Sequence, residues 1–345
     1  NKPPDGFCGE GTSSFKGATV NQPRRGFYRQ PVQTLDWKSL YPSIMMSWNL
    51  CHSTHVVDPT LFGQEGVVAH PVSDTWTTHF VSAERHRGIL PRILESLMKE
   101  RADAKKQMKV HLQRSKDSSF PSEERERDRS LAKVFDGRQL ALKVACNSIY
   151  GACGATETGK YPNLAVSATV TFQGREAMEE KKRILPLYFP EAVIVYGDTD
   201  SLMIMWGNAT TVAESFDCGD AAVDRLNDHF QRVKGLAFME LENEKAYHPY
   251  LLQDKKRYAG RKHEKDGDGV IHDKGIECKG LETERRDTLP FVKRILNDCL
   301  HILMYDIDEH KALACFEGHV RDLKADKIPF EQYVMKKKLS CKVEG

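Results

Sequence analysis

Two short apolar runs separated by a polar segment constrain the fold of this chain most strongly. Residues 193–196 (VIVY) are β-branched and aromatic, and residues 202–206 (LMIMW) are apolar, a composition that favours β-strands. Gly197, Asp198 and Asp200, which lie between the runs, are residue types that form tight turns. The sequence therefore predicts a hairpin that belongs to a β-sheet.

The two aspartates of this turn admit two interpretations. As ordinary turn residues, both would point their carboxylates into water. Residues two apart in an extended chain lie on the same side, however, and two charges about 4 Å apart repel by roughly 4 kcal/mol at an effective dielectric of about 20. A divalent cation would remove that repulsion. The Asp-x-Asp pattern alone does not decide between a turn and a metal site.

A third carboxylate, Asp36, ends the apolar strand predicted for residues 32–36. A strand that ends in an acid beside the hairpin turn would place Asp36, Asp198 and Asp200 at one edge of a sheet. Such a cluster is suitable for two Mg²⁺ ions about 3.5–4 Å apart, the arrangement that serves in-line phosphoryl transfer. No protein nucleophile is then required.

The remaining pattern indicates an α+β fold. Apolar residues at helical spacing predict a long helix over residues 89–113, and a polar break at 114–128 separates it from a second helix over about 123–149. We expect an antiparallel helical hairpin there. Strands and helices do not alternate regularly, which favours α+β. Further predicted elements are a loop entering a hairpin (1–28), a helix opened by Pro42, a helix over 164–185, strands within 241–260 and helices within 288–313.

Composition restricts the class of protein. The chain is 40% hydrophobic and 29% charged, as in soluble globular proteins, and no apolar run approaches the roughly 18 residues of a membrane span, so no membrane partner is expected. Nine scattered cysteines without a C-x-x-C pair indicate reduced thiols in an intracellular compartment. Because the sequence begins with Asn1 and shows no tail signature, we expect a piece of a longer protein.

Positive charge is concentrated locally, although the net charge is only +2. Residues 85–150 hold 16 Lys and Arg against 9 Asp and Glu, and a second basic segment lies at 254–265. On the second long helix, Lys143, Asn147 and Tyr150 share one face, and Arg101 and Lys105 share a face of the first. Three such cations could neutralise a triphosphate. Each of them, taken singly, could equally be solvated surface.

Four stretches of the sequence resemble the polymerase-domain motifs of family B DNA polymerases, in that family's order. They are DWKSLYPSI (36–44), KVACNSIYG (143–151), YGDTDS (196–201) and KKRY (255–258). LYPSIMM, NLCHST, FKGATV and RRGFY are similar to the delta-type and herpesvirus-type branch. The resemblance implies a right-hand polymerase with an antiparallel-sheet palm (1–87 and 151–274), a two-helix fingers hairpin (88–150) and a partial helical thumb (275–345).

The resemblance also implies roles for individual residues. It implies two Mg²⁺ ions held by Asp36, Asp198, Asp200 and the backbone carbonyl of Trp37. It implies dNTP contacts from Ser39, Leu40, Tyr41, Arg101, Lys105, Lys143 and Asn147, with Tyr41 packed beneath the deoxyribose to exclude a 2′-hydroxyl. It implies primer-template DNA contacts, blind to base sequence, from Tyr150, Gly151, Lys255, Lys256, Arg257, Tyr258, Lys279, Arg285 and Arg286.

The implied function is template-directed addition of a dNMP to a primer 3′-hydroxyl, with release of pyrophosphate. A processivity factor outside this sequence and work in a nucleus, a host nucleus for a viral enzyme, are implied by analogy. Lys38 and Trp37 depart from the residues usual in the family, and Lys38 could perturb the triphosphate pocket. Acidic motifs of a proofreading exonuclease are not found in the sequence. Two alternatives remain open: a non-catalytic primer-template binding module, and another two-metal nucleotidyltransferase such as a reverse transcriptase.

Overall fold

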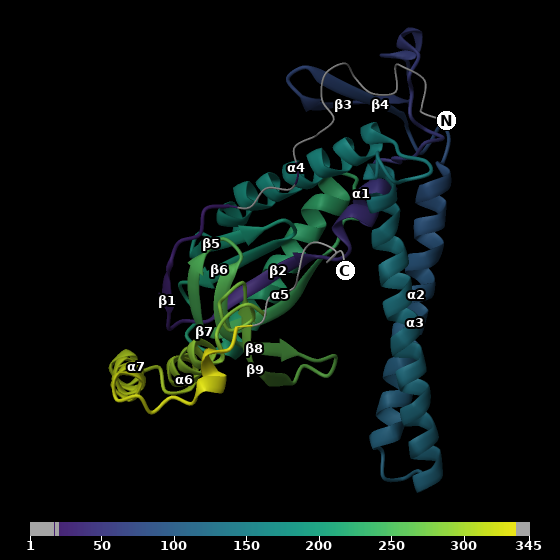
Figure 1. The fold of residues 1–345 in the computed structure, drawn as a ribbon. Coiled ribbons are helices and arrows are strands. Elements are labelled where there is room, and N and C mark those ends of the chain that lie inside the picture. Colours follow the sequence, from purple (N-terminus) through teal and green to yellow (C-terminus); the bar gives the residue numbers. More distant parts are fainter. Residues whose placement is uncertain (1–16, 18–20, 336–345) are drawn as a thin grey trace, which may run out of the picture. The chain divides into compact units, whose positions relative to one another are not determined.

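The computed structural model describes residues 17 and 21–335, and its elements are drawn in Figure 1. The strands are β1 (Gly26–Tyr28), β2 (Val32–Trp37), β3 (Val67–Ser73), β4 (Trp76–Val81), β5 (Ala192–Asp198), β6 (Ser201–Trp206), β7 (Leu241–Asp254), β8 (Arg257–Lys265) and β9 (Ile271–Lys279). The α-helices are α1 (Leu40–Ser47), α2 (Ile89–Lys116), α3 (Ser122–Gly154), α4 (Leu164–Tyr188), α5 (Val212–Asp228), α6 (Pro290–Tyr305) and α7 (Glu309–Lys324). Short 3₁₀ turns span Pro59–Leu61 and Phe330–Tyr333, and a π-helical turn spans His229–Val233.

The chain divides into two compact units, each assembled from separated stretches of sequence. The first, the helical unit, comprises residues 1–18, 38–179 and 229–240. The second, the sheet unit, comprises residues 19–37, 180–228 and 241–345.

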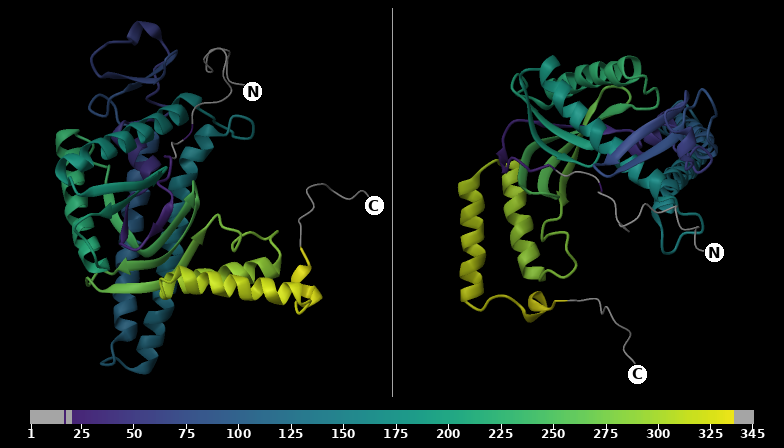
Figure 2. Two further views of the ribbon diagram at one scale, coloured as in Figure 1. Left: turned by 90° about the vertical axis from the view of Figure 1, so that its left-hand side faces the viewer. Right: turned by 90° about the horizontal axis from the view of Figure 1, so that it is seen from above.

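The sheet unit contains an antiparallel sheet with the strand order β5-β6-β2-β7-β8-β9, in which β1 also pairs with β7. Strand β2 lies between β6 and β7, and all of its residues except Asp36 are buried. Helix α5 packs on β2 and β7, and α6 packs on β7 and β8 and against α7. The two yellow helices lie side by side in both views of Figure 2. The central position of β2 places its last residues deep in the sheet.

Buried polar contacts hold α5 against β2. The hydroxyl of Ser215 on α5 donates to Oε1 of Gln33 at 3.0 Å, and Nε2 of Gln33 donates to the carbonyl of Lys245 on β7 at 3.0 Å. A buried amide that is fully satisfied costs little and fixes the register of its strand. The position of Asp36, three residues along β2, is fixed by the same contacts.

In the helical unit, α2 and α3 pack along their length as the long hairpin seen in Figure 1. The sequence predicted both helices, and the turn between them, Asp117–Pro121, falls within the predicted polar break. Helix α1 packs against both, and Pro42 lies in its first turn, as predicted. A two-stranded sheet of β3 and β4 completes this unit.

Other sequence predictions are confirmed or corrected. The α+β class, the strand at 32–36, the hairpin at 193–206 and the helix at 164–185 are confirmed. Most of the predicted opening segment lies outside the described residues, and its described strand, β1, pairs with β7. The predicted helical segment at 288–313 is two helices, α6 and α7. No described helix is long and apolar enough to cross a membrane.

Candidate active site

The three aspartates reach one cavity from two places in the sheet unit. Asp36 lies near the end of β2, where it pairs across the sheet with Glu242 of β7. Asp198 ends β5, and Asp200 lies in the two-residue loop before β6. The neighbouring residues Leu35 and Leu202 are paired across β2 and β6, so the end of β2 lies beside this loop. The sheet therefore brings Asp36 close to Asp198 and Asp200, although more than 160 residues separate them in the sequence.

The β5-β6 loop is tight and strained. The amide of Asp200 donates to the carbonyl of Asp198 at 2.6 Å, and the hydroxyl of Ser201 donates to the same carbonyl at 3.3 Å. Thr199 between them has a φ of 56°, a left-handed conformation that a β-branched residue rarely adopts. Strain of this kind persists where the surrounding structure fixes it, and it concentrates at functional sites.

The aspartates line a cavity of about 390 Å³. Glu244, Lys245 and Lys256 also line it. Glu242 and Glu244 flank Asn243 on β7, and the charges of both raise the pKa of Asp36. The sequence analysis missed both glutamates, although their spacing by two residues within a strand could have indicated them.

The negative charge of Asp36 is compensated only in part. Its Oδ1 is buried and has no hydrogen-bond partner among the described residues. Burial, together with the charges of Asp200 and Glu244, raises the pKa of Asp36 from 3.8 to about 7. Burial also raises the pKa of Asp200, and the neighbouring Asp198 adds to that shift. Both carboxyl groups therefore favour the protonated form more than usual, unless a cation binds beside them.

Asp198 already has a cation. The ammonium of Lys256 donates to both of its carboxylate oxygens, at 2.6 and 2.8 Å. Lys256 lies in the loop between β7 and β8, and its amide donates to the hydroxyl of Tyr196 at 2.8 Å, which anchors the loop beside β5. The sequence analysis predicted a DNA contact for Lys256, and the structure shows it bound to an acid of the cavity.

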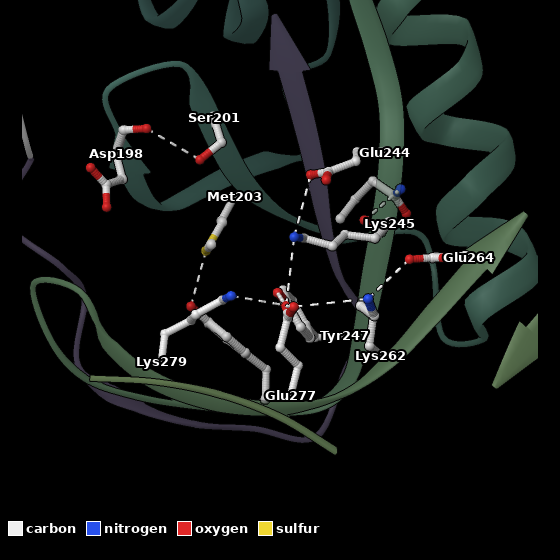
Figure 3. A network of polar contacts seen from close by, with 12 residues as sticks. Asp198, Ser201, Met203, Glu244, Lys245, Tyr247, Lys262, Glu264, Glu277 and Lys279 are labelled. Carbon is white, nitrogen blue, oxygen red and sulfur yellow. Dashed lines mark hydrogen bonds and ion pairs between the residues drawn. The ribbon is translucent and has the colours of Figure 1, made fainter. Parts of the chain in front are cut away.

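A network of lysines continues from the cavity along β7, β8 and β9 (Figure 3). Lys245 lies 3.4 Å from Glu244 and 3.6 Å from Glu277, and Lys262 and Lys279 lie 3.8 and 3.6 Å from Glu277. Burial raises the pKa of Glu277, but the hydroxyl of Tyr247 and the three lysines outweigh this effect and hold that pKa below its usual value. Each lysine of the network is thus paired with a glutamate.

The residues present fit a divalent cation in part. Hard cations prefer carboxylate oxygens, and the unpartnered Oδ1 of Asp36 and the raised pKa values of Asp36 and Asp200 are the features of acids that lack a counter-charge. Among the described residues, no three His, Cys, Asp or Glu side chains lie close enough together to hold an ion between them. A bound cation would therefore draw these carboxylates closer together, and Asp198 would exchange its contact with Lys256 for the ion.

The helical unit brings together four of the predicted dNTP and DNA contacts. Ser39 precedes α1 with a φ of 54°, and Nη1 of Arg101 on α2 lies 3.4 Å from its hydroxyl. The rings of Tyr41 on α1 and Tyr150 on α3 lie 4.3 Å apart between centroids. Nε of Arg101 is buried and has no hydrogen-bond partner among the described residues. Leu40 is buried in the core of this unit.

Other predicted dNTP residues lie on the surface of the helical hairpin. Lys105 on α2 and Lys143, Asn147 and Gly151 on α3 are exposed. A Cβ added to Gly151 would meet no atom within 4 Å. The ammonium of Lys38, the residue that departs from the family, pairs with Glu240. The charge of Lys38 is thus compensated within its own unit.

The predicted DNA contacts of the sheet unit fall into two groups. Tyr258 packs against Tyr196, Tyr247 and Tyr250, beside the cavity that it also lines. The others are basic residues on or near the surface. Lys255 and Arg286 are exposed. The remaining three form ion pairs: Arg257 with Glu282, Lys279 with Glu277, and Arg285 with Glu282 and Asp287. Exposed ion pairs of this kind are weak, so a phosphate could exchange with the acid.

Comparison with known proteins agrees with the motifs and the fold. The family described as DNA polymerase family B matches residues 6–345. The DNA polymerase delta catalytic subunit of Drosophila melanogaster is 39% identical over 337 residues, which cover 94% of this chain and 28% of the relative. The corresponding subunit of Caenorhabditis elegans is 38% identical over 342 residues (96% and 29%), and that of Bos taurus is 38% identical over 339 residues (96% and 28%).

This chain spans less than a third of the length of these curated relatives. The match nevertheless includes every motif described above, and it runs through both units of the structure. The chain therefore belongs to DNA polymerase family B.

Proposed function

We propose that this chain forms the catalytic core of a DNA-directed DNA polymerase, which adds a dNMP to a primer 3′-hydroxyl and releases pyrophosphate. The observation that carries the proposal is the cavity in which Asp36, Asp198 and Asp200 meet, with a buried carboxylate oxygen of Asp36 left unpartnered. Membership of DNA polymerase family B supports the same conclusion.

Asp36, Asp200 and Asp198, with the backbone carbonyl of Trp37, would hold two Mg²⁺ ions. Bound there, such ions would lower the pKa of the primer hydroxyl and stabilise the charge that develops on the departing pyrophosphate. The aspartates would hold the ions in position. Lys256 would then be released from Asp198 and could contact a phosphate or a base of the primer-template duplex. Lys255, Arg257, Tyr258, Lys279, Arg285 and Arg286 would hold the same duplex.

Residues of the helical unit would bind the incoming dNTP. Arg101, Lys105 and Lys143 provide cations for the triphosphate, and the backbone at Ser39 and Leu40 provides amide donors. Tyr41, whose ring lies beside that of Tyr150, would exclude a 2′-hydroxyl. Asn147, Tyr150 and Gly151 would contact the nascent base pair.

The domain assignment follows from these roles. We assign residues 1–87 and 151–274 to a palm, residues 88–150 to fingers and residues 275–345 to part of a thumb. The antiparallel sheet, the hairpin of α2 and α3, and the pair α6 and α7 support the three assignments respectively. A processivity factor outside this sequence and a nuclear site of action extend the proposal by analogy with the delta-type relatives.

Primer extension tests the proposed function directly. The purified chain is mixed with a 5′-labelled DNA primer on a DNA template and on an RNA template of the same sequence, with the four dNTPs and with Mg²⁺ or EDTA. Extension on the DNA template that requires Mg²⁺ supports the proposal. Duplex binding without extension would identify a non-catalytic binding module, and preference for the RNA template would indicate a reverse transcriptase.

A further inference from the structure

One cation of the sheet unit belongs to none of the roles above. Lys181, on α4, is fully buried. Its ammonium donates to the carbonyl of Asp200 at 3.1 Å and to the carbonyl of Leu35, the residue before Asp36, at 3.4 Å. It also lies 5.3 Å from the centroid of the Trp37 ring, at a distance typical of a cation–π contact. One side chain thus joins the end of β2 to the β5-β6 loop.

The position of Lys181 on its helix is one that an apolar residue would ordinarily occupy. Met178, Ile184 and Leu185 are buried, and they lie three or four residues from Lys181 on the same face of α4. A lysine in such a stripe loses the hydration of its ammonium, which costs several kcal/mol unless other charges compensate it. The compensation must come from the groups that surround the ammonium.

Those groups are the acids of the cavity. The ammonium bonds to the carbonyl of Asp200 and to that of Leu35, the residue before Asp36, and the charges of both acids favour the ammonium form, although burial lowers the pKa of Lys181. The influence is mutual, because Lys181 lowers the pKa of both Asp36 and Asp200. The ammonium thus bonds to main-chain carbonyls of the two segments, and Asp36 and Asp200 themselves line the cavity.

We propose that Lys181 is a positioning residue that balances the charge of Asp36 and Asp200 before metal binds, and that fixes the two segments carrying them. This inference rests on the proposed function in that the two acids are taken as the metal ligands. Because a fixed positive charge also repels a cation, Lys181 stabilises the metal-free site and weakens the affinity of the site for metal. Both effects have measurable consequences that do not require catalysis.

The test compares Lys181→Met, which removes the charge and keeps the length of the side chain, with Lys181→Arg, which keeps the charge. Arg183→Met is the matched control, because Arg183 lies two residues along α4, is largely exposed and pairs with Glu180. The melting temperature of each chain is measured in EDTA and in Mg²⁺, and Mn²⁺ affinity is measured by electron paramagnetic resonance without nucleotide or DNA.

For Lys181→Met we expect a lower melting temperature in EDTA, a larger stabilisation by Mg²⁺ than in the wild type, and a dissociation constant for Mn²⁺ that falls about threefold or more. Lys181→Arg should retain most of the wild-type Mn²⁺ affinity, and Arg183→Met should match the wild type. Equal losses of melting temperature in EDTA and Mg²⁺, with unchanged Mn²⁺ affinity, would reduce Lys181 to a packing residue and overturn the inference.

A double variant keeps the test decisive if Lys181→Met folds poorly. Adding Asp36→Asn removes one of the two charges that Lys181 balances, so the double variant should recover part of the lost melting temperature. Identical effects of Asp36→Asn in the wild-type and Lys181→Met backgrounds would contradict the inference. If the wild-type chain binds Mn²⁺ but extends no primer, the proposed function fails while these measurements still decide the role of Lys181.

Discussion

The ammonium of Lys256 lies 2.6 and 2.8 Å from the two carboxylate oxygens of Asp198. The lysine comes from the β7-β8 loop and the aspartate from the end of β5. An acid proposed to bind metal is therefore occupied by a cation proposed to bind DNA. If both proposals hold, duplex binding and metal binding are coupled through this one ion pair.

We predict that Lys256→Met has opposite effects on metal binding and on duplex binding. Freed from its ion pair, Asp198 should bind Mn²⁺ more tightly in the absence of DNA, whereas the affinity for a primer-template duplex should fall, most clearly at low salt. Electron paramagnetic resonance and fluorescence anisotropy measure the two quantities. Lys274→Met is the control, because Lys274 lies on β9, has no role in the proposal and pairs with Glu264 at 3.9 Å. Unchanged Mn²⁺ affinity would show that the ion pair does not compete with metal.

The raised pKa of Asp36 predicts how stability depends on pH. Because the folded state holds this proton more tightly than the unfolded state, the contribution of Asp36 to stability is full below about pH 3.8 and is lost as the pH rises to about 7. Asp36→Asn removes the ionisable group. In EDTA the variant should therefore be more stable than the wild type by a margin that grows between pH 4 and 7, and the difference in melting temperature should grow in the same way.

Ser215, which lies on α5, bonds to the amide of Gln33, a group that does not ionise, so Ser215→Ala is a suitable destabilised control. A difference between Asp36→Asn and the wild type that stays constant from pH 4 to 7 would show that Asp36 titrates normally. Saturating Mg²⁺ should also flatten the wild-type curve, since a bound cation restores the usual carboxylate pKa.

Tyr41→Val should relax discrimination between ribonucleotides and deoxyribonucleotides. The ring of Tyr41 lies 4.3 Å from that of Tyr150 between centroids, which limits how far it can move away from a 2′-hydroxyl. The ratio of kcat/KM for dNTP over rNTP should fall by about tenfold or more, which corresponds to about 1.4 kcal/mol. Tyr161→Val, at a tyrosine that is 80% exposed, is the control. An unchanged ratio would remove Tyr41 from this role.

Arg101→Met should weaken nucleotide binding. Nε of Arg101 has no hydrogen-bond partner among the described residues, and Nη1 makes only a 3.4 Å contact with Ser39, so the guanidinium has donors available for a phosphate. We expect the KM for dNTP to rise about tenfold with a smaller change in kcat. Arg92→Met, at an exposed arginine of the same helix, should leave KM unchanged. A selective fall in kcat would instead place Arg101 in transition-state stabilisation.

The sequence predicted those helices and strands whose patterns depend only on neighbouring residues. The apolar stripe of α2, the alternation between two strands and a turn at 192–206, and the position of Pro42 in α1 depend on neighbouring residues only. Helix α5 escaped prediction because its sequence contains a glycine and four aspartates, and β3 because it contains a proline and exposed residues. The tertiary contacts of these elements outweigh their weak propensity.

The site residues that lie in short sequence motifs could be predicted from the sequence. The three aspartates were found because together they form a cluster suitable for two cations and because they lie in the motifs DWKSLYPSI and YGDTDS. Lys181 was not found, because within the run EEKKRIL it resembles a solvated helix face and only the packing of α4 buries it. The pairing of Lys256 with Asp198 was also beyond the sequence, since it depends on how the β7-β8 loop folds back toward β5.

The central claim is that Asp36 and Asp200 share metal ions during nucleotide addition. The most direct measurement is anomalous diffraction from crystals of this chain with Mn²⁺, a primer-template duplex and a non-hydrolysable dNTP, with Asp200→Asn crystals treated identically. We predict two anomalous peaks within coordination distance of Asp36 and Asp200 in the wild type, and loss of at least one of them in the variant. Peaks remote from both carboxylates, or an unchanged pair in Asp200→Asn, would contradict the claim.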